Sequence, residues 1–136
     1  MCGRYASTRE PTALVEAYAV DADLAEDLGA QYNVAPTMGI YGILERQRKD
    51  SRDVERELRA LRWGLVPSWA KDLKVGSRLI NARVETVATK PAFRRAFAIR
   101  RCLLPADGFY EWETTGARER GRPVSSPTSF TRPMPA

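Results

Sequence analysis

Apolar positions along the chain occur in short runs, some at helical and some at strand spacing, separated by proline, glycine and charged residues. Residues 11–18 have helical spacing, with their apolar side chains on one side, Pro11 in the first turn and Thr8 as a candidate N-cap. The acidic segment 21–30 ends at Gly29, which predicts a second helical turn. We therefore expect one short amphipathic helix followed by a helical turn in this part of the chain.

Strand-forming residues occupy the segments on either side of two polar connections. Residues 40–45 and 57–63 enclose a nearly all-charged segment that must stay in solvent, which predicts a β-hairpin. Residues 99–104 and 109–113 enclose the sequence Pro-Ala-Asp-Gly, whose order suits a β-turn. A second hairpin is expected there.

Helical spacing returns between these two hairpins. It is seen over residues 84–87 and, after a break at Pro91, over residues 92–97. Phe93 and Phe97 fall on one face of the later segment, and we expect them to pack in the core.

The character of the sequence changes after Glu113. Residues 114–136 have few aliphatic side chains, no periodicity and three prolines among the last ten positions. Such a segment cannot offset the entropy lost on ordering, so a disordered tail is predicted. We therefore expect one α+β domain over residues 1–113, followed by a tail over residues 114–136.

The size and charge of the chain are consistent with one domain and a polyanionic partner. The chain has 136 residues, of which 43% are hydrophobic, a size suited to a single core. Its 22 basic residues exceed its 17 acidic ones, giving a net charge of +5, and most of the basic residues are arginine. This indicates either nucleic acid binding or only a solvated basic surface.

No targeting or membrane segment is predicted, so we expect a cytoplasmic protein. The chain has two cysteines, Cys2 and Cys102, and no histidine. In a reducing compartment both thiols are expected to be free, and ligands for a zinc site are lacking. We expect neither a metal nor a cofactor. The sequence does not indicate an oligomeric state.

Cys2 has unusual chemistry if Met1 is removed. The new N-terminus then carries an α-amine and a thiol on adjacent carbons, a 1,2-aminothiol. The amine forms an imine with an aldehyde, and the thiolate closes the imine to a thiazolidine ring. The alternative is that Cys2 is an incidental residue of a frayed terminus.

Six blocks of sequence place Cys2 in a wider pattern. They are Met-Cys-Gly-Arg-Tyr at the start, Tyr-Asn-Val-Ala-Pro-Thr at 32–37, Arg-Trp-Gly-Leu-Val-Pro-Ser-Trp-Ala at 62–70, Leu-Ile-Asn-Ala-Arg-Val-Glu-Thr-Val at 79–87, Lys-Pro-Ala-Phe-Arg at 90–94, and Arg-Cys-Leu-Leu-Pro-Ala-Asp-Gly-Phe-Tyr-Glu-Trp at 101–112. In this order, over residues 1–113, they resemble the SRAP (SOS response-associated peptidase) family. The resemblance implies antiparallel strands in a barrel-like core with short flanking helices.

The resemblance also implies an activity. The family removes its own first methionine and then protects abasic sites in single-stranded DNA through a thiazolidine link to the exposed cysteine, here Cys2. Asn81 would hold the ring-opened sugar, and Glu111 would move protons during imine formation. Arg4 and Arg83 would hold phosphates beside the lesion.

General chemistry is compatible with these roles, although each residue also has a simpler explanation. A carboxylate near an amine and an aldehyde can deliver and recover protons, and a neutral amide can bind a hydroxyl without competing for them. In the simpler explanation, the role of Asn81 is to cap the following helix, and the role of Glu111 is to pair with an arginine. Trp69, after a proline, is our candidate for stacking on a base, whereas Trp63 is expected to lie in the core.

The chain departs from the family after Glu113. The family has a late histidine, assigned to opening the sugar ring and reversing the crosslink, and this chain has none. The following residues look like a truncated product or a shifted reading frame, so we expect an incomplete core and slower crosslinking. The alternatives are a non-catalytic single-stranded DNA-binding fragment and an inert product that does not fold. A peptidase acting on other proteins has only the family's name in its favour.

Overall fold

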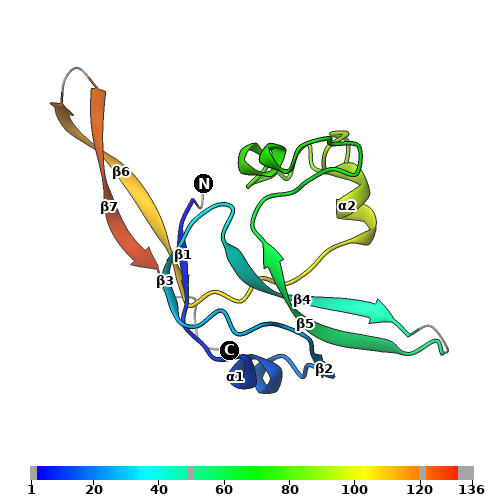
Figure 1. The fold of residues 1–136 in the computed structure, drawn as a ribbon. Helices are drawn as coiled ribbons and strands as arrows, with labels where there is room; N and C mark the ends of the chain where they lie inside the picture. The colour runs from blue at the N-terminus through cyan, green and yellow to red at the C-terminus, as the bar shows by residue number, and fades with distance from the viewer. Residues whose placement is uncertain (1–2, 49–50, 120–121, 132–136) are drawn as a thin grey trace.

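Two small β-sheets and a few short helices make up the structure, a computed structural model that describes residues 3–48, 51–119 and 122–131 (Figure 1). One sheet has the strand order β3–β1–β6–β7 and the other β2–β5–β4. The strands are β1 (Tyr5–Ser7), β2 (Ala22–Asp23), β3 (Gln31–Val34), β4 (Gly39–Gln47), β5 (Val54–Arg62), β6 (Gly108–Glu119) and β7 (Arg122–Thr131); the helices are α1 (Pro11–Ala17), the 3₁₀ helix η1 (Leu73–Arg78) and α2 (Arg94–Ile99). The α+β prediction is confirmed. Over the described residues both sheets are open, so the core is not a closed barrel.

The predicted first hairpin and first helix are both present and share a core. Strands β4 and β5 pair antiparallel with Ile43 opposite Leu58, and both strands extend further into the charged segment than the sequence predicts. Leu14 of α1 packs with Tyr41, Ile43 and Leu58 in one buried cluster. The apolar helix face that the spacing of residues 11–18 predicts is therefore present, and it is buried against the β4–β5 hairpin.

Leu58 is the best test of this core, because its side chain is 0% exposed. Replacing Leu58 with alanine leaves a cavity and is expected to lower the free energy of unfolding by about 2–5 kcal/mol. Val54 on the same strand is 59% exposed, and Val54→Ala should change that free energy by less than about 0.5 kcal/mol. Urea unfolding followed by circular dichroism measures both; equal losses would show that this cluster is not the core.

A second core joins the two sheets. Tyr5, Val34, Ile40 and Trp63 form a buried cluster, with Leu61, Ile80 and Phe109 packed against it. The Tyr5 and Trp63 rings meet edge to face with centroids 5.4 Å apart, a favourable geometry for aromatic pairs. The prediction that Trp63 lies in the core is confirmed.

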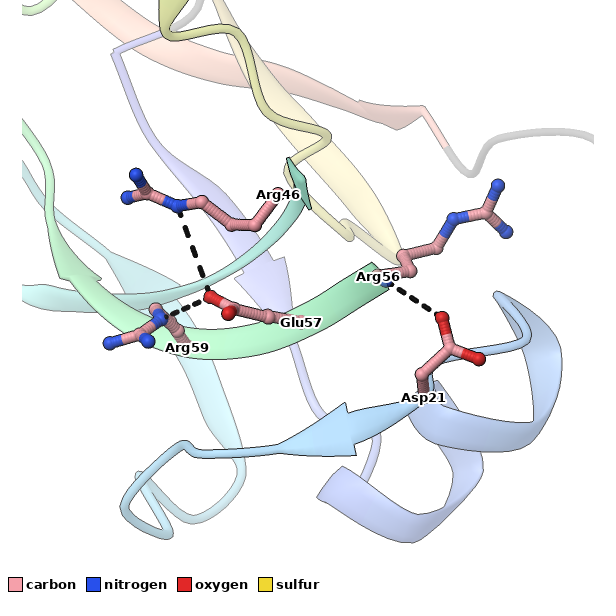
Figure 2. A network of polar contacts seen from close by, with 5 residues as sticks. All are labelled: Asp21, Arg46, Arg56, Glu57 and Arg59. Atoms are coloured by element: carbon pink, nitrogen blue, oxygen red, sulfur yellow. Dashed lines mark hydrogen bonds and ion pairs between the residues drawn. The ribbon is translucent and has the colours of Figure 1, made fainter. Parts of the chain in front are cut away.

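The helical turn predicted over residues 21–30 is wrong. Residues 22–23 instead form β2, parallel to β5, and the Asp21 carboxylate accepts a hydrogen bond of 2.7 Å from the backbone N–H of Arg56 (Figure 2). Further along, the Leu28 N–H donates to the Tyr41 hydroxyl at 2.8 Å. Burial raises the pKa of Tyr41. The segment is extended because its hydrogen-bond partners lie on the distant β4–β5 hairpin.

The proposed N-cap of α1 is also wrong. The helix starts after Glu10, which makes no side-chain cap. Thr8 instead donates from its N–H and its hydroxyl to the Asp107 carboxylate, at 2.6 and 2.8 Å. Asp107 also lies 3.5 Å from Arg9. This carboxylate therefore ties the end of β1 to the turn before β6, a contact that local sequence cannot reveal.

The segment between the hairpins is less regular than predicted. Residues 84–87 form turns, in which the Val87 N–H donates to the Arg83 carbonyl at 2.9 Å. Ile99 ends α2, and in the predicted strand 99–104 only Leu103 pairs, as an isolated bridge to Ile43. Phe97 is 43% exposed, so its placement in the core is wrong.

The segment after Glu113 differs most from expectation. Strand β6 continues to Glu119 and pairs antiparallel with β7, where we predicted a disordered tail. Pro123 and Pro127 lie on β7, an edge strand, where a missing N–H is tolerated. Pro127, one of the three prolines that favoured disorder, is thus compatible with an edge strand. Residues 120–121 and 132–136 of the predicted tail lie outside the described residues. The β6 strand predicted from residue 109 is confirmed.

Candidate functional site

Strand pairing brings two of the predicted site segments side by side. Tyr5 of β1 lies opposite Phe109 of β6, and the Tyr110 N–H donates to the Arg4 carbonyl at 3.0 Å. Glu111 follows on β6 and is partly buried. Cys2, which carries the predicted chemistry, lies outside the described residues. Arg4, two positions further along, lies beside β6 through its backbone hydrogen bond from Tyr110.

Asn81 is held near the same core by its neighbour Ile80. The Trp63 indole N–H donates to the Ile80 carbonyl at 3.0 Å, and Ile80 packs against the cluster that contains Tyr5. Gly64 has a φ of +126°, and a Cβ there would collide with the backbone of Gly76. Glycine at both positions therefore lets the chain after β5 cross η1 closely and return to Asn81.

One residue from each segment that carries a predicted catalytic residue thus packs in the second core. These residues are Tyr5, three positions after Cys2, together with Ile80 and Phe109. Because alternate residues of a strand face the same side, Glu111 lies on the same face of β6 as Phe109. The structure therefore gathers the segments that carry Cys2, Asn81 and Glu111 around one cluster, although they lie far apart in the sequence.

Arg4 has a polar partner that the sequence analysis missed. Its Nη1, on the residue just before β1, donates to the side-chain oxygen of Asn33 on β3 at 2.9 Å. On the same stretch of β3, the Tyr32 carbonyl accepts a 2.8 Å hydrogen bond from the Tyr110 hydroxyl. Asn33 lies in the block Tyr-Asn-Val-Ala-Pro-Thr, which carried the family resemblance but to which we gave no role. That block was the available signal.

The other two predicted DNA-binding residues are accessible. Trp69 is 64% exposed and Arg83 is exposed, both on the connection between β5 and α2 that also carries Asn81. They lie outside the strand pairing that joins the Arg4 and Glu111 segments. Trp112 is also exposed, with its ring centroid 6.3 Å from that of Tyr110. Exposed rings of this kind are available to stack on bases.

A groove of about 780 Å³ lies elsewhere, along the β4–β5 hairpin. Figure 2 shows Glu57 between Arg59 and Arg46, with its carboxylate 2.7 and 3.9 Å from their Nε atoms. Arg48 and Glu55 pair in the same groove at 3.6 Å. Its charges are largely matched within the hairpin, which favours a structural role for them over ligand binding.

Cys102 is a poor competitor for the chemistry assigned to Cys2. Although the residue is exposed, partial burial of its thiol raises the pKa of Cys102. Less thiolate is therefore present near neutral pH, and the thiolate is the nucleophile.

Neither a metal-ligand cluster nor a membrane-spanning helix is found in the part of the chain that the structure describes. It contains no group of three or more His, Cys, Asp or Glu side chains placed to hold a metal ion. In the same ranges no helix has the length and apolar character needed to cross a membrane.

Comparison with protein families gives a match that covers nearly the whole chain. The model of the family described as SOS response associated peptidase (SRAP) matches residues 1–132. The chain belongs to the SRAP family. The match continues past Glu113 into β7, so the SRAP pattern does not stop where the sequence first seemed to change character.

Curated SRAP relatives have names that state an activity. The abasic site processing protein YoqW of Bacillus subtilis is 42% identical over 114 residues, which cover 83% of this chain and 48% of that protein. YoaM of the same organism is 38% identical over 121 residues, covering 88% and 51%. HMCES of Xenopus tropicalis is 30% identical, covering 88% and 41%. The chain spans about half the length of these SRAP relatives.

Solved structures agree on the fold. A protein from Bacteroides thetaiotaomicron superposes with a TM-score of 0.65 at 23% identity, covering 91% of this chain and 52% of its own. A protein from Bordetella bronchiseptica gives a TM-score of 0.62 at 26% identity, covering 91% and 55%. The arrangement of strands in this SRAP chain therefore occurs in larger, experimentally determined structures.

Proposed function

We propose that this chain binds single-stranded DNA at abasic sites and bonds to them covalently through Cys2, after removing its own Met1. The α-amine of Cys2 adds to the C1 aldehyde of the opened deoxyribose, and loss of one water gives an imine. The thiol then gives up its proton and adds as the thiolate to the carbon of the protonated imine, which completes a thiazolidine ring. No oxidant, metal or cofactor is consumed, and the only product released is water.

Glu111 and Asn81 supply the groups this reaction needs besides Cys2. Glu111 donates a proton as the hydroxyl of the first adduct leaves and recovers it when the thiol attacks. Asn81 hydrogen-bonds a hydroxyl of the opened sugar. The observation that carries the proposal is the shared core of Tyr5, Ile80 and Phe109, because it holds the three segments together. The names of the curated relatives support the same substrate.

Arg4, Arg83 and Trp69 bind the strand around the lesion. The two arginines contact phosphates, since a guanidinium can donate two parallel hydrogen bonds to a phosphate group. Trp69 stacks on a neighbouring base. All the residues to which we give a role lie in residues 1–113, which we propose as the active portion of the domain. We further propose that the protein acts in the cytoplasm and associates with the nucleoid when bound to DNA.

Removing the Trp69 ring is expected to weaken binding of single-stranded DNA by about 5- to 150-fold, since base stacking on an aromatic ring is worth about 1–3 kcal/mol. Fluorescence anisotropy of a labelled strand measures the loss for Trp69→Ala. Leu73→Ala is the matched control, because Leu73 is also 64% exposed and lies on the same connection. Equal affinities of the two variants would exclude Trp69 as a stacking residue.

The proposal is tested by incubating the purified chain with a single strand that carries one abasic site. We expect a species that survives heating in detergent and migrates as protein plus DNA on a denaturing gel. The same strand with an intact base should give none. Binding without any such species would instead support the non-catalytic binding module, and an equal yield on both strands would contradict an abasic-site reaction.

A further inference from the structure

The excess positive charge of the chain is concentrated in one segment between β5 and β6. Residues 71–101 hold nine of the 22 basic residues and only two of the 17 acidic ones, so the rest of the chain has more acidic than basic residues. All nine basic residues of this segment are exposed, and none of their side chains forms an ion pair with a described residue. A surface of this kind attracts polyanions.

The later part of this segment is a series of turns that ends in α2. The Lys90 carbonyl accepts a hydrogen bond from the Arg94 N–H at 2.9 Å, and the Ala96 carbonyl accepts one from the Arg100 N–H at 2.7 Å. No residue from Arg83 to Arg100 is buried, a stretch that the structure describes in full. In Figure 1, α2 lies well apart from α1 and β7. The turns thus connect Arg83, a proposed phosphate contact, to an exposed helix.

This helix combines arginines with an exposed aromatic ring. Two arginines precede Phe97 and two follow it: Arg94, Arg95, Arg100 and Arg101. Phe97 is 43% exposed, although phenylalanine usually packs in a core. Arginines that contact phosphates, together with a ring that stacks on a base, are typical of surfaces that bind single strands. An acidic peptide would use the arginines but has no base to place on the ring. These five residues are called the α2 surface.

We propose that the α2 surface is a second contact region for the DNA strand, which continues from Arg83 onto α2 beyond the abasic site. The inference rests on the proposed function, because it takes Arg83 as a phosphate contact beside the lesion. It adds a dependence on length. A strand too short to reach α2 is held by the lesion contacts alone, whereas a longer strand gains phosphate contacts from the arginines and stacking on Phe97.

The test compares two strands, of about 6 and about 16 nucleotides, within the usual range of single-strand site sizes. Each carries a central reduced abasic site, which keeps the opened sugar but has no aldehyde, so no covalent step contributes. Anisotropy gives the affinity over a range of salt concentrations, and thermal melting confirms that each variant is folded. Unlabelled poly-glutamate and an unlabelled strand of equal charge serve as competitors.

Replacing Arg94 and Arg95 together with glutamine is expected to weaken binding of the long strand about tenfold. The plot of log affinity against log salt should become shallower by about 1.4, the loss of two phosphate contacts on a single strand. Phe97→Ala should weaken binding of the long strand about 5- to 150-fold and keep the parent slope, because stacking releases no counterions. On the short strand both variants should bind as the parent does.

Two control variants match these changes. Arg48→Gln combined with Arg52→Gln removes two positive charges from exposed positions next to the ends of β4 and β5. Ile99→Ala shortens an apolar side chain on α2 that is 69% exposed but has no aromatic ring. Both controls should keep nearly the parent affinity and the parent slope on the long strand.

The inference is overturned if the arginine variant keeps the parent slope on the long strand, or if the α2 variants lose as much on the short strand or no more than their controls. Displacement of the long strand by poly-glutamate as effective as by the unlabelled strand would also overturn it, since the surface would then fit an acidic peptide.

Failure of the proposed function is seen separately, in the adduct assay. A chain that forms no adduct but shows this dependence on strand length retains the α2 surface and excludes the covalent reaction. An adduct-forming chain without the length dependence excludes the α2 surface alone.

Discussion

Cys2→Ala is expected to abolish the covalent adduct with abasic single-stranded DNA. Alanine leaves the α-amine, which can form only an imine, and an imine hydrolyses under the denaturing conditions that a thiazolidine survives. The variant should still bind the strand, because the residues assigned to phosphate and base contacts are unchanged. Denaturing gels measure the adduct and anisotropy measures the binding.

The matched control for this experiment is Cys102→Ser. It removes the other thiol of the chain, whose pKa is raised by burial, and should leave the adduct yield unchanged. An undiminished adduct from Cys2→Ala, or its loss from Cys102→Ser, would show that Cys2 is not the point of attachment.

Glu111→Gln is expected to slow adduct formation by about 10²- to 10⁴-fold, the usual contribution of a general acid–base group. Glutamine has nearly the same shape and can still hydrogen-bond, but it cannot exchange a proton near neutral pH. The rate is measured under single-turnover conditions with protein in excess, so that binding is saturated and only the chemical step is compared.

Glu16→Gln gives the control for the change in charge. Glu16 is exposed on α1, away from the three segments gathered by the second core, and its replacement should leave the rate unaltered. A Glu111→Gln rate equal to that of Glu16→Gln would remove Glu111 from the reaction and leave its carboxylate a structural partner only.

The parts of the fold that follow from local patterns were predictable. The apolar face of α1 and the paired runs of the β4–β5 hairpin are encoded within short windows, and the structure has both. Segment 21–30 was not predictable in this way. Its acidic, glycine-ended composition is helix-like, but its backbone pairs with β5, more than thirty residues away, and tertiary pairing overrides a weak local preference.

The candidate site shows the same division. Cys2, Asn81 and Glu111 could be named from sequence blocks because their chemistry is carried by the residue type. The contact of Asn33 with Arg4 could not, because it depends on β3 lying beside β1, a pairing that no local pattern indicates. Asp107 is similar: within a β-turn it looks like an ordinary turn residue, whereas it holds the end of β1 through Thr8.

The covalent link itself is tested most directly by the mass of the adduct and of its N-terminal peptide. The account predicts an intact mass equal to the chain without Met1 plus the strand, less one water. After digestion with nuclease and trypsin, which cleaves after Arg4, the residual sugar should remain on the peptide of residues 2–4. An adduct that retains Met1, or a modification found on a lysine, would contradict attachment through a freed Cys2.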